Sequence, residues 1–440
     1  MSLKRNSLTT IVSAIVPAIA TLFLTPLYLK VIGQESYGVM ALIWLLLGYF
    51  GVFEGGLGIA ISQKISTDNS DLTKRSERVG TALALAVILA AIGSLVMVPL
   101  AYYYFKNYGQ SFTGNSRIYL LIGMLCVGLL LANISSVIGG AIRSASDLTS
   151  YNVIVTFASL AFQITPLITG IYISTSVEWL VVSAVAARAL PIPILYFLMK
   201  KLILGDQKPL IAMRHAREMV HFGLWVSVSS ILTPLMTALD RFIIGAIKGP
   251  ASVAAYTLAL QLSDRVAMVP SAILSPYFPL YARSSGDERI SLKKRIYFKY
   301  NLITVGLASC TALVADPFLR FWVGASIASE AGNAASLVAV GFWANSLARL
   351  SYAHLQAEGR PHTVAKCHLI EAPIYLVFLY FSIKYGGLLG AAAAYSSRCI
   401  FDMMLLAYVS GDIAISWRAN FFGFIAVSAA STFAIAISNG

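Results

Sequence analysis

Charged residues are scarce in this chain. They make up 12% of its 440 residues, against about 25% in an ordinary soluble domain. Hydrophobic residues make up 58%, and the mean hydropathy is +0.77. This composition excludes a disordered chain, a collagen and a soluble enzyme, and it predicts a membrane protein.

Cysteine and nucleotide-binding motifs are also sparse. The four cysteines fall in apolar runs without C-x-x-C spacing, and the five histidines show no metal-ligand spacing. There is no G-x-x-x-x-G-K-[ST] phosphate loop, which excludes ATP hydrolysis by that route. No loop exceeds roughly 20 residues, which leaves no room for a separate catalytic domain. We therefore predict no enzyme activity, no cofactor and no metal.

The N-terminus shows features of a secretory signal peptide. Lys4 and Arg5 precede an apolar run in which Ala18-Ile19-Ala20 imitates a cleavage site. The run continues to Leu29, however, which exceeds the ~7–15 apolar residues of a signal peptide. A first membrane-spanning helix is the preferred interpretation.

Apolar runs of about 20 residues, the length that crosses a bilayer, recur along the whole chain. We predict an all-α polytopic membrane protein with an N-terminal six-helix bundle (1–199), a basic cytoplasmic linker (200–218) and a C-terminal six-helix bundle (219–410). An extra apolar segment, 411–440, forms a thirteenth span, a partial hairpin or an interfacial helix. The predicted helices lie near 8–31, 37–62, 80–104, 117–141, 151–173, 179–199, 219–247, 251–275, 296–318, 332–355, 363–384 and 387–410, and the extra run lies at 419–437.

The net charge of +13 is explained better by a concentration of basic residues on one side of the membrane than by a nucleic-acid partner. The basic residues are scattered over short loops and do not form one patch. With the N-terminus in the cytoplasm, about 21 of the 32 lysines and arginines fall on the cytoplasmic side, as the positive-inside rule requires. Six helices, a basic linker and six more helices form the layout of a duplicated transporter.

Ten ionisable residues fall inside the predicted spans, where each costs roughly 2.5–3.5 kcal/mol at the helix centre and so marks a functional candidate. They are Glu54, Arg188, Asp240, Arg241, Asp264, Arg265, Arg349, Glu371, Arg398 and Asp402. Arg188, Arg265 and Arg398 lie near mid-depth of the sixth, eighth and twelfth helices. We predict that these three arginines bind an anionic substrate, for which guanidinium geometry is suited.

Mutual neutralisation is the alternative interpretation of such charges. Arg398 and Asp402 lie four residues apart on one helix face, so they are able to pair with each other. Arg349 and Glu371 lie at matching depths of two helices joined by a short loop, which predicts a structural pair.

The other intramembrane charges are candidates for coupling transport to an ion gradient. Asp240, Arg241 and Asp264 lie on neighbouring helices and predict a charge network across that hairpin. Glu54 is a candidate proton-coupling carboxylate, and a hydrogen-bonded structural acid is the equally weighted alternative.

Particular motifs resemble a known family. Pro17 through Pro26-Leu27-Tyr28, then Ile32-Gly33-Gln34-Glu35-Ser36-Tyr37-Gly38, then Phe53-Glu54-Gly55-Gly56-Leu57-Gly58 resemble the start of the polysaccharide-export (Wzx-type flippase) family. Leu239-Asp240-Arg241 through Tyr256 is similar to its second-half signature. That family belongs to the multidrug/oligosaccharidyl-lipid/polysaccharide exporter superfamily. The chain departs from the pattern at Glu54, where aspartate is common, and in the extra run at 419–437.

The resemblance implies two bundles around a central cleft in the bacterial cytoplasmic (inner) membrane. It implies a flippase that moves an undecaprenyl-diphosphate-linked oligosaccharide, such as an O-antigen repeat unit, from the cytoplasmic to the periplasmic leaflet by alternating access. H⁺ or Na⁺ is the implied coupling ion, and a polysaccharide polymerase and chain-length machinery are the implied protein partners. A multidrug or cation exporter, a lipid II flippase and a non-transporting assembly scaffold remain as alternatives.

Overall fold

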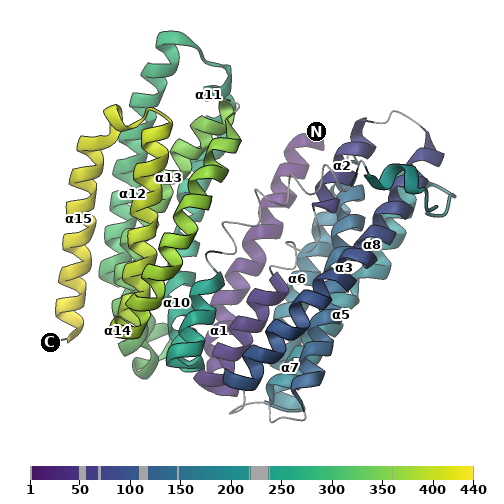
Figure 1. Cartoon of the computed structure of the whole chain (residues 1–440), viewed down its shortest axis with the longest axis horizontal. Helices are drawn as coiled ribbons and strands as arrows, with labels where there is room; N and C mark the ends of the chain where they lie inside the picture. Colours follow the sequence, from purple (N-terminus) through teal and green to yellow (C-terminus); the bar gives the residue numbers. More distant parts are fainter. Residues whose placement is uncertain are drawn as a thin grey trace. The chain divides into compact units, whose positions relative to one another are not determined.

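The computed structural model describes the chain except for residues 1, 49–55, 68–70, 109–116, 146–147, 218, 220–235, 237, 359 and 440. Helices account for most of the described residues, and no strand occurs among them. The chain divides into two compact units, Met1–Leu235 and Met236–Gly440, whose helices are shown in Figure 1. The prediction of an all-α polytopic protein is confirmed, because eight helices of the described part are long and apolar enough to cross a membrane.

The first unit consists of helices that pack in sequence order. They are α1 (Ser2–Gly48), α2 (Leu57–Thr67), α3 (Leu72–Tyr108), α5 (Ile118–Arg143), α6 (Thr149–Tyr172), α7 (Val177–Ala189) and α8 (Pro191–Met199), followed by the single turns η2 (Lys200–Leu204) and η3 (Met213–His215). The predicted sixth helix corresponds to α7 and α8, which meet at Leu190 before Pro191 and Pro193. Leu190 keeps helical backbone angles, and Val177–Leu204 is one candidate span. Proline lacks the N–H that would continue the first helix.

The second unit begins with a helical segment at 238–248. It continues with α10 (Pro250–Val266), α11 (Met268–Arg283), α12 (Gly286–Val323), α13 (Ala325–Ala357), α14 (Pro361–Val409) and α15 (Ile413–Asn439). The predicted helix 251–275 is likewise divided, between α10 and α11, at Ala267.

Two of the long helices fold back on themselves. α1 contains 47 residues and breaks at Gly33, whose φ is 78°. The rings of Tyr28 and Trp44 lie 5.2 Å apart, whereas 16 residues of straight helix would separate them by about 24 Å. α14 breaks in the same way at Gly387, with φ 57°. Each is therefore a helical hairpin whose tight turn uses a backbone conformation that glycine adopts readily.

Close helix contact in the first unit depends on small residues. A Cβ atom added at Gly140 of α5 would overlap the carbonyl oxygen of Gly58 in α2. Small side chains of this kind let transmembrane helices approach backbone to backbone. Around this contact, apolar side chains of α2, α3, α5 and α8 form a buried core that includes Ile61 and Val79.

α13 is the central helix of the second unit, and it contacts α10, α11, α12, α14 and α15. It buries a series of alanines and the whole of Trp343, whose Nε1 donates a 2.9 Å hydrogen bond to Asn301 in α12. The alanine surface allows several helices to pack closely around it.

The extra C-terminal run forms the full-length helix α15, drawn in yellow in Figure 1. It packs along α12 and α13. Asn301 donates to the Ala419 carbonyl at 2.8 Å, and Ser431 donates to the Ser336 carbonyl at 2.7 Å. Residues Trp417–Ser438 meet the length and apolarity of a membrane span. Of the three interpretations of this segment, a membrane span is the one that the length of α15 fits.

Candidate functional site

Buried charges converge inside the α14 hairpin. Because the chain folds back at Gly387, Glu371 on the first arm comes within 3.6 Å of Arg398 on the second, measured from Oε1 to Nη1. A straight helix would separate these residues by about 40 Å. Both side chains are almost fully buried.

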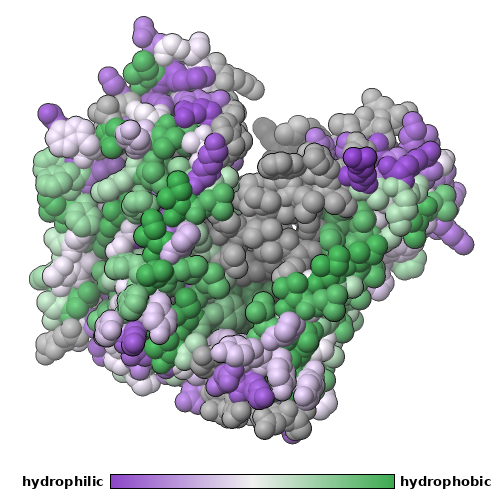
Figure 2. Space-filling view, in the orientation of Figure 1, coloured by the Kyte–Doolittle hydropathy of each residue, from purple (hydrophilic) through white to green (hydrophobic). Residues whose placement is uncertain are grey.

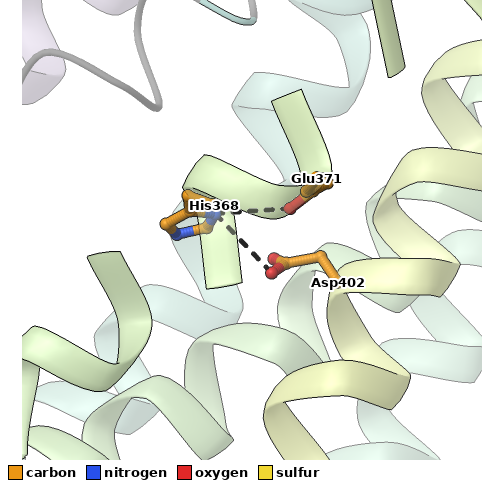
Figure 3. A group of neighbouring side chains, drawn as sticks. All are labelled: His368, Glu371 and Asp402. Atoms are coloured by element: carbon orange, nitrogen blue, oxygen red, sulfur yellow. Dashed lines mark hydrogen bonds and ion pairs between the residues drawn. The ribbon is translucent and has the colours of Figure 1, made fainter. Parts of the chain in front are cut away.

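A histidine joins the two acids of this site (Figure 3). His368 Nδ1 lies 3.4 Å from Glu371 Oε2 and 3.8 Å from Asp402 Oδ1. His368 and Glu371 are three residues apart and so share a helix face, whereas Asp402 projects from the facing arm. We call His368, Glu371, Asp402 and Arg398 the α14 cluster.

The guanidinium of Arg398 is held on several sides. It lies 5.4 Å from the ring centre of Tyr375 and 5.5 Å from that of Tyr395, which is cation–π distance. Its Nη2 also lies 3.5 Å from the sulfur of Cys399. These contacts and the Glu371 pair fix a positive charge next to the two carboxylates.

Asp240 extends the same electrostatic network. Its Oδ2 accepts a 3.0 Å hydrogen bond from Tyr256, and its Oδ1 accepts one of 2.6 Å from the backbone N–H of Arg241. The carboxylate is completely buried and lies within the electrostatic influence of Arg241 and Arg398.

The α14 cluster is equipped to take up a small cation. Its His, Glu and Asp ligand atoms all lie within 4.8 Å of one another. Glu371 Oε1 and Asp402 Oδ1 are buried and accept no hydrogen bond from the described residues, although Arg398 Nη1 lies 3.6 Å from the first and His368 Nδ1 lies 3.8 Å from the second. Such acceptors are costly unless a proton or a cation reaches them. The neighbouring Arg398 disfavours a divalent metal and leaves a proton or a monovalent ion as the suitable occupant.

The structure gives Arg349 and Glu371 different partners from the predicted pair. Arg349 Nη1 donates to the Ser271 hydroxyl at 3.1 Å, while Glu371 interacts with His368 and Arg398. Matching depth carries no information about which way each side chain points around its helix. Similarly, Arg398 forms its ion pair with Glu371 rather than with Asp402, the partner on its own face.

The other predicted site residues lie at separate places. In the first unit, Arg188 donates a 2.8 Å hydrogen bond to the Leu47 carbonyl and lies 5.6 Å from the ring of Phe162. In the second unit, Asp264 lies within the electrostatic influence of Arg241, Arg265 and Arg349. Glu54 lies outside the described residues.

A second buried network was not anticipated. Lys293 of α12 lies 2.9 Å from Asp412 in the turn between α14 and α15. The other oxygen of Asp412 accepts from Ser351 at 2.9 Å and lies 2.8 Å from His354 Nδ1. His354 Nε2 in turn lies 2.8 Å from the hydroxyl of Tyr277 on α11. We call this set the Asp412 network; it ties four parts of the second unit together.

Asp412 remains ionised to unusually low pH. Burial alone would raise the pKa of its carboxyl, but the hydrogen bond and charge of His354, together with Lys293, outweigh burial and lower that pKa to about 2. All polar partners in this network are internal, which indicates a structural role.

The sequence spacing of His368 contains a signal that metal-binding motifs do not include. His368 and Glu371 have the i, i+3 spacing of neighbours on one helix face. Asp402, from the other arm, was identified only as a partner for Arg398. The Asp412 network has no comparable signal, because its members come from segments far apart in the sequence.

The helical hairpins, the two units and the long apolar helices define a polytopic all-α membrane protein. The family described as polysaccharide biosynthesis protein matches residues 30–329. The chain belongs to this family, which confirms the resemblance seen in its motifs.

Relatives and solved structures agree with this assignment. The chain is 23% identical over 412 residues to a Shigella flexneri protein with the provisional name O-antigen transporter, covering 93% of this chain and 98% of that protein. The structure of the lipid II flippase MurJ in an inward closed conformation matches with a TM-score of 0.69 at 12% identity, covering 98% of this chain and 97% of that one. An inward-facing multidrug resistance MATE transporter matches with a TM-score of 0.67 at 17% identity, covering 92% and 99%. At these identities the two structures show a shared fold.

Proposed function

We propose that the protein moves an undecaprenyl-diphosphate-linked oligosaccharide, such as an O-antigen repeat unit, from the cytoplasmic to the periplasmic leaflet. The family match, the Shigella flexneri relative and the flippase-like fold support this proposal. A sugar headgroup cannot cross ~30 Å of hydrocarbon unaided. Alternating access of two helical units would shield it during the crossing.

The α14 cluster is the proposed coupling site, and its two unsatisfied buried carboxylate oxygens are the observation that carries this role. When a proton or Na⁺ occupies the carboxylates, the attraction of Glu371 for Arg398 weakens. The two arms of α14 are then less strongly held together. Ion binding is thereby converted into a change in a transmembrane hairpin, which is the link that gradient-driven transport needs.

The arginines divide between two proposed roles. Arg398 is enclosed by tyrosines and paired with Glu371, so a coupling role suits it better than the substrate-binding role expected from depth. Arg188 and Arg265 remain the candidates for the substrate diphosphate. The proposed location is the bacterial cytoplasmic membrane with the N-terminus inside, and a polysaccharide polymerase and chain-length machinery are the proposed protein partners.

Complementation of an oligosaccharide-flippase deletion tests the function, scored by surface polysaccharide and by lipid-linked units accumulating in the cell. We expect the native protein to restore export. Glu371→Gln and Asp402→Asn should each reduce export at least ~100-fold, because a coupling group acts in every transport cycle. Arg188→Ala and Arg265→Ala should abolish export at normal protein levels.

Glu330→Gln is the matched control, because Glu330 is an exposed carboxylate of the same unit. Normal export by both α14 cluster variants would reject the coupling site while leaving the flippase proposal intact. A well-inserted native protein that restores no export but extrudes cationic drugs would instead establish the multidrug exporter alternative.

A further inference from the structure

The linker after η2 is fastened along the first turns of α3. We call residues 205–213 the strap. The Leu210 N–H donates to the Ser76 carbonyl at 3.2 Å, and the Ala212 N–H donates to the Thr81 hydroxyl oxygen at 2.9 Å. The Ser76 hydroxyl donates in turn to the Lys208 carbonyl. The strap is therefore a fixed surface feature of the first unit.

A glycine makes this close attachment possible. A Cβ atom added at Gly80 of α3 would overlap the backbone of Leu210. The strap thus lies directly on the helix backbone. Beyond it, Arg214 and His215 both interact with Glu77 of α3, which holds the end of the strap in place.

The strap presents large apolar side chains outward. Leu210 is 52% exposed, Ile211 64% and Met213 63%. A segment pinned by its backbone cannot turn these side chains inward. At a membrane surface, however, they would enter the boundary between headgroups and acyl chains, as the apolar face of an interfacial segment does.

Positive charge surrounds these apolar side chains. Segments 71–78 and 200–217 contain eight lysines and arginines but only three acids, and one of those acids, Glu77, is already paired. Lys74, Lys201 and Lys208 are exposed and form no ion pair with the described residues. Figure 2 shows hydrophilic residues gathered at this end of the first unit, above a hydrophobic flank over α3 and α8.

We propose that the strap and the first turns of α3 form a docking surface for the headgroups of anionic phospholipids. The three apolar side chains enter the lipid boundary, and the lysines contact phosphate groups. Basic residues beside an interfacial apolar segment are the combination that recognises an anionic leaflet. A soluble acidic partner would not account for the outward apolar side chains.

Lipid retention by the full-length protein tests this surface. The purified protein is incubated in detergent with phosphatidylglycerol or phosphatidylcholine, and bound lipid is counted by native mass spectrometry. We expect preferential retention of phosphatidylglycerol. The triple variant Lys74→Gln, Lys201→Gln, Lys208→Gln should lose roughly fivefold in affinity per charge removed, or about 100-fold in total.

The matched control removes three exposed lysines elsewhere, Lys106, Lys248 and Lys384, by the same substitution. It should retain phosphatidylglycerol like the native protein. A double variant, Leu210→Ser with Ile211→Ser, keeps every charge and should still bind more weakly. If the triple variant does not fold, Lys201→Gln and Lys208→Gln alone should each lose about fivefold.

Three results would overturn the proposal. The first is equal retention of both lipids by the native protein. The second is the same loss in the control triple as in the strap triple. The third is displacement of phosphatidylglycerol by free glycerol 3-phosphate at millimolar concentration, since that would indicate a simple anion site. None of these readouts depends on transport, so the flippase proposal stands or falls separately.

Discussion

At the scale of single residues, the second unit contains two buried charge groups of contrasting character. In the Asp412 network every charged or polar atom has a partner at close distance. In the α14 cluster, by contrast, carboxylate oxygens of Glu371 and Asp402 accept no hydrogen bond from the described residues. A fully satisfied network resists change, whereas a partly satisfied one responds to an added ion. The first is suited to holding the unit together, and the second is the proposed coupling site.

Replacement of Asp412 by Asn should destabilise the protein by about 3 kcal/mol, because the buried Lys293 loses its nearer counter-charge and keeps only Glu358, 3.6 Å away. Thermal unfolding in detergent at pH 7 measures this loss. Since folding lowers the pKa of Asp412 to about 2, from an ordinary value of about 3.9, its contribution is complete above about pH 4 and disappears as the pH falls toward 2. The stability difference between native protein and variant should therefore shrink over that range. A constant difference between pH 4 and pH 2 would contradict the assigned ionisation.

The sequence identified these charges as candidates but did not predict their partners. Arg398, Glu371 and Asp402 were identified because ionisable residues are conspicuous in an apolar run. Their pairing depends on rotation about each helix and on how the two arms of α14 align. Neither quantity follows from hydropathy, so the Arg349 pairing and the inclusion of His368 required the structure.

At the scale of elements, hydropathy located most helices well, because about 20 apolar residues are needed to cross the membrane. The hairpin turns at Gly33 and Gly387 both lie at predicted helix boundaries. The breaks at Leu190 and Ala267 were not predicted, because the apolar runs continue through them. The hydropathy pattern did not predict the helix contacts either, because the effect of a glycine depends on which atoms lie opposite it.

Two glycines of α5 provide a paired test of helix contact. Gly140→Ala places a methyl group against the Gly58 carbonyl and should destabilise the protein by about 1–3 kcal/mol. Gly123→Ala in the same helix meets open space and should be neutral, or stabilising by up to about 1 kcal/mol, because alanine favours the helix. Thermal unfolding of both variants gives the comparison. Equal effects would show that α2 and α5 do not approach at Gly140.

At the scale of the whole molecule, α15 changes the topology expected of two six-helix bundles. It packs on α12 and α13 through side-chain and backbone hydrogen bonds along its length. Added to the twelve predicted spans, it makes an odd number. The two ends of the chain are then expected on opposite faces of the membrane.

Reporter fusions test this topology. Alkaline phosphatase, which is active only outside the cytoplasm, should be inactive when fused after Gly411 and active when fused after Gly440. The expectation follows from the positive-inside orientation of the N-terminus and from one further crossing by α15. Equal activity of the two fusions would show that α15 does not cross.

The hairpins of α1 and α14 also bear on how the protein is made. At each turn only a few residues around one glycine separate two largely apolar arms, so the two arms follow each other closely within spans of 39 and 47 residues. An insertion machinery that releases helices one at a time would leave the first arm in the bilayer before its partner arm has been made. We therefore expect each hairpin to enter the bilayer as a preformed pair during synthesis. Glu371 and Arg398 would then already be paired, and their charges balanced, when the hairpin enters the lipid.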